Sequence, residues 1–303
     1  MWGVPTDIPF RTILETLRQS GSAVVVVDQT DYSSTEVRLD SAGHSVSGTL
    51  EIDGEVIPLE CISAAFLRPH DLRRLGQPGA AGEQDPALQH GLAVEEILQI
   101  WTEIADTFFV NRLSDMSSNN SKPYQAELIR SAGFNVPDTL ITTDPAAVDE
   151  FRQIHQEVIY KSISAVRSIV TRLTREHQAR LQNVANCPTQ FQERVPGIDY
   201  RVHVVGERVF SCEVLSDADD YRYAHAEGKS VRITARELPE NTAERCLALA
   251  AKCNLALAGI DLRLTPSGDW YCFEVNPSPV FTYYQKATGA RIDEAIAELL
   301  RSR

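Results

Sequence analysis

Apolar and polar positions in the first third of the chain alternate between a helical and a strand-like spacing. Residues 10–21, FRTILETLRQSG, have helical spacing and end on a glycine, which predicts a helix. The apolar run at 22–29 predicts a strand, and the polar–apolar alternation over 44–60 around Asp53 and Gly54 predicts a β-hairpin. The last two elements expected here are a strand at 62–69 and a long amphipathic helix at 87–108.

The rest of the chain continues to alternate helices and strands, with no internal repeat. Helical spacing recurs at 122–133, 145–155, 175–185, 239–254 and 291–301. Short apolar runs predict strands at 138–143, 157–163, 189–195, 199–205, 208–215, 257–264 and 269–276, and a hairpin-like segment at 168–174. We therefore expect an α/β or α+β chain with mixed sheets, not a helix bundle or a sandwich.

Composition and charge limit the class of protein. The chain has 303 residues, 43% of them hydrophobic and 23% charged, which suits about two domains or one large domain with lobes. No apolar stretch approaches the roughly 18 residues of a membrane helix, and the N-terminus lacks the features of a secretion signal. The net charge of −13 argues against a general nucleic-acid binder, because phosphate contacts need a basic face.

Cysteines and histidines show no metal-binding spacing. The six cysteines include no CxxC pair, and several lie inside apolar runs, as is typical of buried free thiols in a reducing cytosol. The seven histidines form no cluster spaced like zinc ligands. We therefore expect a cytoplasmic protein with reduced cysteines.

The apolar strand at 269–276 carries two polar side chains that need partners. Glu274 and Asn276 lie two residues apart, so they share one face of the strand, whereas Phe273 and Val275 face the other way. An unpaired buried carboxylate is costly, so a positive group should lie opposite Glu274. That group could be an arginine, a set of backbone donors or a metal ion.

Asp261 poses the same problem in the preceding apolar strand. The turn between the two strands predicts a hairpin that brings Asp261 beside Glu274 and Asn276. Two carboxylates and an amide oxygen are the hard oxygen ligands that Mg²⁺ prefers. The alternative is that Arg263 or backbone donors satisfy the buried acids.

Two lysines indicate an anion nearby. Lys161 ends a β-branched strand, where burying an ammonium group is reasonable only beside a negative charge. Lys122 lies in the first turn of a predicted helix, where the helix dipole disfavours a cation, so a bound phosphate would explain it. A solvated surface lysine is the alternative at each position.

Further charged residues lie at strand ends and in a polar loop. Glu193 ends a strand, and Asp199 and Arg201 share one face of the next strand. Arg222 lies among acidic and aromatic residues in the loop after residue 215.

Taken in order, these residues resemble the ATP-grasp superfamily of carboxylate–amine ligases, in its RimK-type branch. The resemblance covers about residues 114–303 and is carried by Lys122, Lys161, Gln192-Glu193, Asp199-Tyr200-Arg201, Asp261 and Glu274-x-Asn276. Within that branch the chain is similar to the ligases that macrocyclise ribosomal peptides of the microviridin (graspetide) type. The segments behind this closer match include SKPYQAELIRSAGFNVPDTLIT, VIYKSIS, DYRVHVVGERVF, DDYR and FEVNPSPVF.

The resemblance implies a role for each of these residues. Lys122 and Lys161 would hold nucleotide phosphates, and Asp199 would lie near the ribose. The backbone of the hinge formed by Glu193, Arg194 and Val195 would face adenine. Two Mg²⁺ ions would be held by Asp261, Glu274 and Asn276. Arg222 and Arg201 would steady the transferred phosphoryl group.

The resemblance also implies an architecture and a reaction. We expect an ATP-grasp fold with an N-terminal α/β pre-ATP-grasp lobe at 1–113, a central lobe at 114–195 and a C-terminal lobe at 196–303, the last two clasping ATP. The implied enzyme activates a carboxylate as an acyl phosphate and joins it to an amine or hydroxyl, on a ribosomal precursor peptide. A RimK-like ligase that adds free amino acids, a phosphotransferase and a nucleotide-binding module without turnover are the alternatives. The resemblance further suggests a homodimer, while the net charge and the lack of a long apolar stretch argue against a nucleic-acid or membrane partner.

Overall fold

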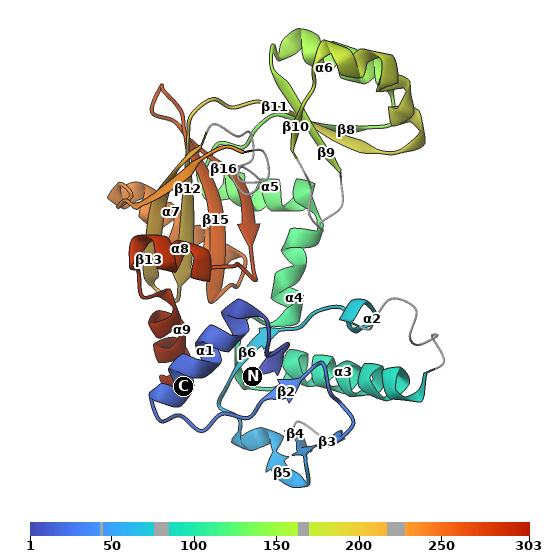
Figure 1. Cartoon of the computed structure of the whole chain (residues 1–303), viewed down its shortest axis with the longest axis vertical. Coiled ribbons are helices and arrows are strands. Elements are labelled where there is room, and N and C mark those ends of the chain that lie inside the picture. The colour runs from blue at the N-terminus through green and yellow to red at the C-terminus, as the bar shows by residue number, and fades with distance from the viewer. Residues whose placement is uncertain (43–44, 76–84, 163–169, 217–227) are drawn as a thin grey trace.

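The computed structural model of the chain describes all residues except 43–44, 76–84, 163–169 and 217–227 (Figure 1). The described residues form four β-sheets. The strands of one N-terminal sheet lie in the sequence between strands of the other, and the two remaining sheets follow in sequence order. Helices and strands are mixed throughout, as the hydrophobic pattern predicts.

The N-terminal region contains a parallel sheet and an antiparallel sheet. The parallel sheet has the order β2-β1-β6-β7, and the antiparallel sheet has the order β3-β4-β5. The strands are β1 (Trp2–Gly3), β2 (Val27–Asp28), β3 (Thr35–Ala42), β4 (Ser45–Ile52), β5 (Glu55–Pro58), β6 (Ala64–Arg68) and β7 (Phe108–Val110). The helices are α1 (Ile8–Gln19), η1 (Leu59–Cys61), α2 (Leu72–Leu75), α3 (Pro86–Ile104), α4 (Leu113–Met116) and η2 (Ser117–Asn120).

Two predictions for this region have different outcomes. The hairpin around Asp53 and Gly54 is confirmed, because β4 pairs with β5 and both turn residues have positive φ, 52° and 82°. The strand predicted at 22–29 is wrong for most of its length, since only Val27 and Asp28 pair with β1. Apolar character at 22–26 comes from packing, not from a sheet ladder: Val24 and Val26 pack against the core near α1.

The central region is a small antiparallel sheet covered by two helices. Its strand order is β10-β9-β11-β8. The elements are β8 (Thr139–Thr142), α6 (Pro145–Ile154), β9 (Val158–Ser162), β10 (Thr171–Arg172), η3 (Arg175–Asn186) and β11 (Thr189–Glu193). The segment predicted as an α-helix at 175–185 forms the 3₁₀ helix η3, and β10 pairs with β9 as the hairpin-like pattern at 168–174 predicts.

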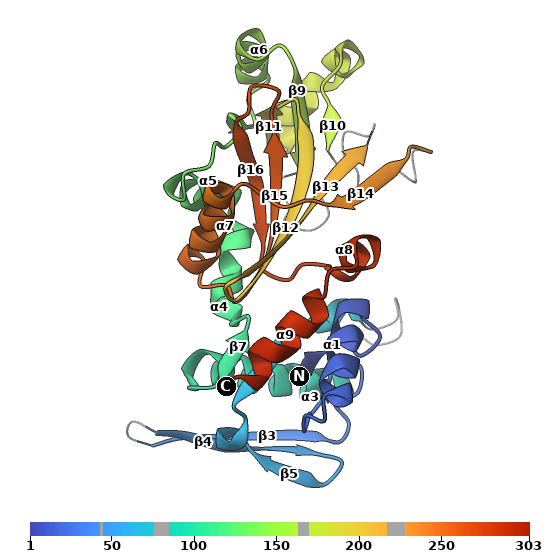
Figure 2. The same ribbon diagram turned by 90° about the vertical axis from the view of Figure 1, so that its left-hand side faces the viewer.

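The C-terminal region is a five-stranded antiparallel sheet with the order β14-β13-β12-β15-β16. Its strands are β12 (Ile198–Val205), β13 (Arg208–Ser216), β14 (Val231–Ala235), β15 (Leu257–Leu264) and β16 (Trp270–Asn276). Its helices are α7 (Glu240–Lys252), α8 (Thr282–Thr288) and α9 (Ile292–Arg301). The helix α5 (Lys122–Ser131), earlier in the chain, packs with α7 over this sheet, and Ile129, Leu249 and Ile260 share its core (Figure 2).

Four helices begin in the same way, with a capping side chain and a proline in the first turn. Asp7, Asp85, Ser121 and Asp144 each accept a hydrogen bond from a backbone amide of the helix that follows. This local chemistry fixes where α5 begins, and therefore where Lys122 lies.

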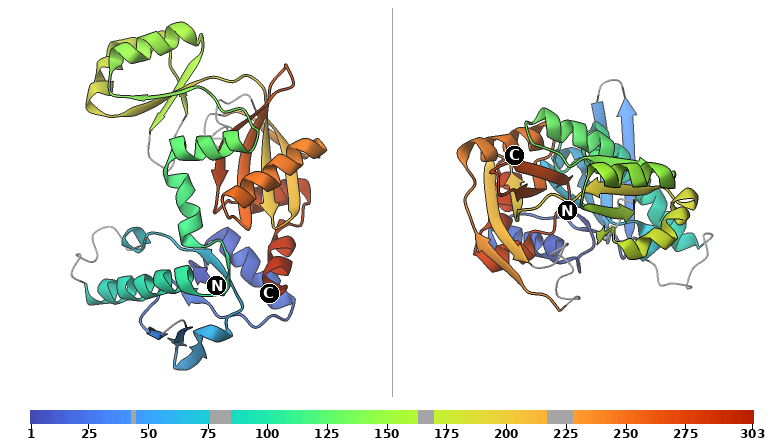
Figure 3. Two further views of the ribbon diagram at one scale, coloured as in Figure 1. Left: turned by 180° about the vertical axis from the view of Figure 1, so that it is seen from behind. Right: turned by 90° about the horizontal axis from the view of Figure 1, so that it is seen from above.

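The two ends of the chain meet in the N-terminal region. Figures 2 and 3 show α9 beside α1, and Phe10, Ile13, Ile292 and Ile296 are fully buried in one core. Helix α9, which follows the five-stranded sheet in the sequence, therefore packs in the core of the N-terminal region and connects this region to that sheet.

Candidate active site

The hairpin of β15 and β16 brings the predicted acids together. Asp261 pairs directly with Glu274 across the two strands, and Gly259 pairs with Asn276. Ile260 and Val275 point into the core between them and are fully buried. The prediction that Asp261 lies beside Glu274 and Asn276 is therefore confirmed by the register of the hairpin.

A β-bulge in β16 changes the face on which one residue lies. The register shifts so that Asp261 pairs with Glu274 but Leu262 pairs with Cys272, which leaves Phe273 as the extra residue. Cys272 is fully buried, whereas Phe273 lines a cavity on the opposite side. Arg263, which shares a face of β15 with Asp261, lies over the Phe273 ring at 5.1 Å, so Phe273 lies on the face of Asp261 and Glu274. The prediction that Phe273 faces away from Glu274 is wrong, because it assumed an unbroken alternation.

Basic side chains from two other elements lie opposite the acids. Lys122 Nζ, at the start of α5, lies 2.6 Å from Glu274 Oε1 and 3.0 Å from Asn119 Oδ1. Arg201 Nη1, on β12, lies 2.6 Å from Asp261 Oδ1. The two acids are thus paired with a lysine and an arginine.

Arg201 occupies space that is open because residue 259 is a glycine. Its side chain is only 7% exposed, and its guanidinium lies over the ring of Tyr284 at 5.5 Å. A Cβ atom on Gly259 would lie 2.1 Å from Arg201 Nη2 and 2.6 Å from Pro279 Cβ. Gly259 is therefore required for the arginine to reach Asp261.

Asp199 and Arg263 form a second ion pair one step along the same strands. Arg263 donates from Nε and Nη2 to the two oxygens of Asp199, at 2.7 and 2.9 Å, and from Nη1 to the Val195 carbonyl at 2.8 Å. The cross-strand register of β12 and β15 sets both this pair and the Arg201–Asp261 pair. Arg263 thus binds Asp199, while Arg201 is the arginine that pairs with Asp261.

The two predicted phosphate-binding lysines line one cavity. This cavity of about 310 Å³ lies between α5, the central sheet and β16. Lys122, Lys161, Gln190, Gln192 and Phe273 are among the residues that line it. It combines two cations with an apolar wall, which suits a ligand with an anionic end and a flat apolar part.

Gln125 holds α5 against β16 and thereby positions Lys122. Its Nε2 donates to the Val275 carbonyl at 2.8 Å, and its Oε1 accepts from the Val275 amide at 3.1 Å. The side chain is only 1% exposed, so this backbone-like pairing is shielded from water.

The loop after Asn276 is anchored by the N-terminal region. Arg68 Nη1 donates to Ser278 Oγ at 2.8 Å and to the Pro279 carbonyl at 3.3 Å, while its Nε donates to Asp7 Oδ2 at 2.5 Å. Asn111 Nδ2 donates to the Pro277 carbonyl at 2.6 Å. The N-terminal sheet thus supports one edge of the site.

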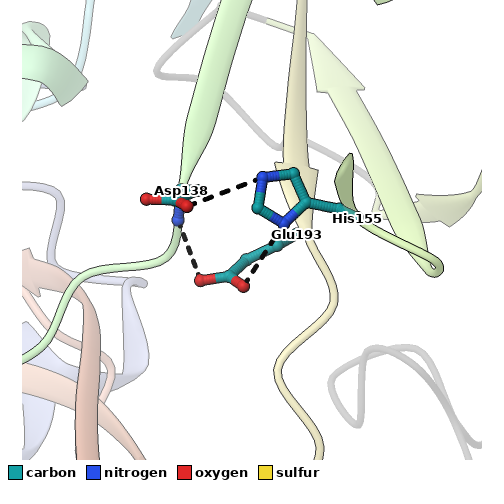
Figure 4. Close-up of side chains that lie close together, drawn as sticks. All are labelled: Asp138, His155 and Glu193. Carbon is teal, nitrogen blue, oxygen red and sulfur yellow. Dashed lines mark hydrogen bonds and ion pairs between the residues drawn. The ribbon is translucent and has the colours of Figure 1, made fainter. Parts of the chain in front are cut away.

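The side chain of Glu193 points away from the cavity. Strand alternation puts Gln190 and Gln192 on the cavity side of β11 and Glu193 on the other. There Glu193 Oε1 accepts from the Asp138 amide at 3.0 Å, and Oε2 lies 3.7 Å from His155 Nδ1 (Figure 4). The backbone amides of Glu193 and Arg194 donate to the Asp138 and Glu157 carbonyls.

The cluster of Asp138, His155 and Glu193 is arranged for ion pairs. His155 Nε2 lies 3.5 Å from Asp138 Oδ2, so the two ring nitrogens face different carboxylates (Figure 4). One potential ligand atom from each residue lies within 4.8 Å of the others, but each ring nitrogen of His155 already faces a carboxylate of its own. These mutual contacts, with the Asp138 amide donating to Glu193, favour a structural role at the end of β11.

Comparison with known proteins identifies the family. The profile of the RimK-like ATP-grasp domain matches residues 119–300, which is more than half of the chain. The chain belongs to the RimK-like ATP-grasp family. A comparison with curated proteins finds no match.

Solved structures similar over the whole chain are ATP-grasp ligases. The ligase PsnB, solved with a phosphomimetic variant of its minimal precursor, Mg and ADP, is 26% identical, with 99% of this chain and 96% of that chain covered and a TM-score of 0.78. A RiPP-associated ligase of Chryseobacterium gregarium, solved with ADP and a leader and core peptide, is 20% identical, with 99% and 95% covered and a TM-score of 0.81. The macrocyclase MdnC of Microcystis aeruginosa MRC, bound to its precursor MdnA, is 23% identical, with 99% and 97% covered and a TM-score of 0.79.

These matches confirm the RimK-type resemblance and the ATP-grasp fold that the sequence predicts. The chain is an ATP-grasp ligase of the ADP-forming kind, and ATP and Mg²⁺ are its cofactors. Among the described residues, no helix is both long and apolar enough to cross a bilayer.

The residues of this ATP-grasp hairpin fit a divalent ion. Asp261 and Glu274 offer carboxylate oxygens on directly paired residues, 25% and 28% exposed. Asn276 Oδ1 accepts from the Ser278 amide at 2.9 Å and keeps a second lone pair. An all-oxygen donor set of this kind suits Mg²⁺, which would replace Lys122 and Arg201 as the partner of the acids.

Several residues of the ATP-grasp site were not singled out from the sequence. These are Gly259, Gln125 and Gln190, whose sequence surroundings give little indication of a site. Gln190 and Gln192 do, however, flank an apolar residue in a buried strand, as Glu274 and Asn276 do. Polar residues at alternate positions of a buried strand were thus a usable signal. Arg222 lies in 217–227, outside the described residues.

Proposed function

We propose that this ATP-grasp ligase closes rings on a ribosomal precursor peptide, joining a side-chain carboxylate to an amine or hydroxyl of the same peptide. The observation that carries the proposal is the likeness over 99% of the chain to PsnB, a ligase solved with its precursor, Mg and ADP, at 26% identity. This likeness includes the N-terminal region, which lies outside the match at 119–300. A macrolactam or a macrolactone would form, depending on the nucleophile.

In the proposed reaction, the substrate carboxylate attacks the γ-phosphate of ATP and forms an acyl phosphate and ADP. The amine or hydroxyl then attacks the acyl carbon and releases inorganic phosphate. Protein groups mainly position the reactants and neutralise charge, so the paired cations and acids of the site are the expected machinery. Mg²⁺, when bound, supplies charge neutralisation on the phosphates and a template for them.

The proposed nucleotide contacts fall into two groups, one for the phosphates and one for the adenine and ribose. Lys122 and Lys161 would bind phosphates, supported by their position on one cavity beside the acid hairpin. The hinge of Glu193, Arg194 and Val195 would face adenine through its backbone, and Asp199 would lie near the ribose.

The metal and phosphoryl roles require an exchange of partners. Asp261, Glu274 and Asn276 would hold two Mg²⁺ ions, and Arg201, with Arg222, would steady the transferred phosphoryl group. In the structure, Lys122 and Arg201 are paired with Glu274 and Asp261. Binding of Mg²⁺ and ATP would free both cations for phosphate, so each group would exchange its partner for another of the same sign of charge.

Mass spectrometry of the peptide product tests the reaction. The protein is incubated with ATP, Mg²⁺ and the peptide encoded beside its gene, and the loss of one water per ring is expected. A gain of amino-acid residues would instead indicate RimK-like addition, and a gain of phosphate would indicate a phosphotransferase. Consumption of ATP without any change in the peptide would contradict all three.

We further propose a cytoplasmic location, a lobe division at residues 113 and 195, and a homodimer without nucleic-acid or membrane partners. The six free cysteines, four of them buried, suit a reducing compartment. Light scattering on the purified protein tests the dimer, and a monomer mass would contradict it.

A further inference from the structure

The side chain of Gln190 has an unexplained acceptor in the nucleotide cavity. Gln190 lies on β11, is only 3% exposed and lines the cavity that also contains Lys122 and Lys161. Its Oε1 is buried and has no hydrogen-bond partner among the residues that the structure describes. A buried acceptor without a partner lowers stability, so its presence needs a reason.

Other glutamines at the same cavity show what a structural role requires. Gln125 satisfies both ends of its amide with the backbone of Val275. Gln192, two residues from Gln190 on the same face, donates from Nε2 to Thr139 Oγ1 at 3.0 Å. Gln190 therefore differs from Gln125, whose two amide atoms are both satisfied, in having a buried acceptor without a partner among the described residues.

The surroundings of Gln190 match a nucleobase. Gln190 pairs across the sheet with Lys161 on β9 and with Ile141 on β8. Ile129 and Phe273 add apolar surface on the α5 and β16 side of the cavity. A flat heterocycle would thus lie between apolar walls with its polar edge at Gln190 and its phosphates toward the lysines.

We propose that Gln190 selects adenine through its N6 and N7 edge: Oε1 accepts from the N6 amine, and Nε2 donates to N7. This proposal rests on the proposed placement of ATP in the cavity. A glutamine amide offers one acceptor and one donor side by side, which matches the adenine pair of donor N6 and acceptor N7. Guanine presents two acceptors, O6 and N7, so either orientation of the amide leaves two oxygen or nitrogen acceptors facing each other.

Nucleotide analogues test each half of this contact on the native protein. Affinities for ATP, purine riboside triphosphate, 7-deaza-ATP and GTP are measured by calorimetry with Mg²⁺ and without peptide. Purine riboside triphosphate lacks the N6 amine, and 7-deaza-ATP lacks the N7 acceptor. We expect each to bind more weakly than ATP, and GTP to bind about ten- to hundredfold more weakly.

The variant Gln190→Leu separates recognition from folding. It should lose about tenfold in ATP affinity and bind the two analogues no more weakly than ATP. Because leucine removes an unpaired buried acceptor, the unfolding midpoint of the ligand-free variant should stay equal or rise. Gln182→Leu, on the exposed side of η3, is the matched control and should bind all nucleotides as the native protein does.

The outcomes distinguish this inference from the proposed function. If ATP binds in a Lys161-dependent way but the analogues bind equally well, the role of Gln190 is refuted and the placement of ATP stands. A lower unfolding midpoint in Gln190→Leu, with unchanged discrimination, would assign the residue to the fold instead. If the native protein binds no nucleotide, both proposals fail. Should Gln190→Leu not fold, the analogue series on the native protein decides alone.

Discussion

Two groups of acidic side chains in this protein have different kinds of hydrogen-bonding partner. In the N-terminal region, Glu95 is 7% exposed and accepts from Gln29 Nε2 at 2.5 Å and from the Tyr32 hydroxyl at 3.1 Å. Trp2 in turn donates to Tyr32. All of these partners are neutral, and burial raises the pKa of Glu95 above its ordinary value.

The acids of the active site are instead paired with cations. Asp261 and Glu274 contact Arg201 and Lys122 at 2.6 Å each, and both carboxylates keep about a quarter of their surface exposed. A pair at an open face can exchange its partners for a metal ion and a phosphate, because each new partner carries the same sign of charge. The Glu95 group has no such exchange open to it, so it serves the fold.

Loss of Glu274 should have the largest effect on activity. In Glu274→Ala we expect ADP formation with peptide to fall at least about a hundredfold, because a metal ligand and the partner of Lys122 are both removed. The unfolding midpoint should change little, since the side chain is partly exposed. Asp269→Ala, at the exposed turn of the same hairpin, is the control. An undiminished rate in Glu274→Ala would refute the metal assignment.

Filling the space at Gly259 should displace Arg201. In Gly259→Ala the new Cβ would meet Arg201 Nη2, so the arginine must leave Asp261 or the strands must move. We expect roughly a ten- to hundredfold loss of ADP formation and a free energy of unfolding lowered by about 1–3 kcal/mol. Rate measurements and urea titrations check both values. Native values for both would show that Arg201 does not depend on this space.

Lys161→Ala should weaken nucleotide binding more than it affects the fold. We expect about tenfold lower ATP affinity by calorimetry, the scale of one charge-assisted hydrogen bond. Lys252→Ala, at the exposed end of α7, removes the same charge far along the chain and serves as the control. Equal affinity in the two variants would exclude Lys161 from the phosphate site.

Glu95→Gln should affect stability alone, and in a pH-dependent way. The raised pKa of Glu95 means that the native state keeps a proton that the unfolded state loses, so the native protein loses stability as the pH rises above the unfolded value of about 4.5. Glutamine cannot ionise, so the variant should be more stable by about 1 kcal/mol at pH 8 and equal to the native protein near pH 4. Urea titrations across this range, with Glu96→Gln as the exposed control, test the sign. A stability difference that does not change with pH would contradict it.

Much of the active site was predictable because it obeys strand geometry. Glu274 and Asn276 stand out as polar residues in an apolar strand, and the turn before them predicts the hairpin with Asp261. The same rule applied to the strand at 189–195 would have found Gln190 and Gln192. Local rules fail at Phe273, because a bulge depends on the partner strand and not on the residue itself.

The sequence by itself determined the order of elements, the helix starts capped by Asp7, Asp85, Ser121 and Asp144, and the kinds of side chain that reach the site. These features depend on neighbours a few residues away, which the sequence contains directly. Only the tertiary structure decided which cation faces which acid. Arg201 and Arg263 lie on neighbouring strands, and the register between β12 and β15, set by packing over the whole sheet, assigns one to Asp261 and the other to Asp199.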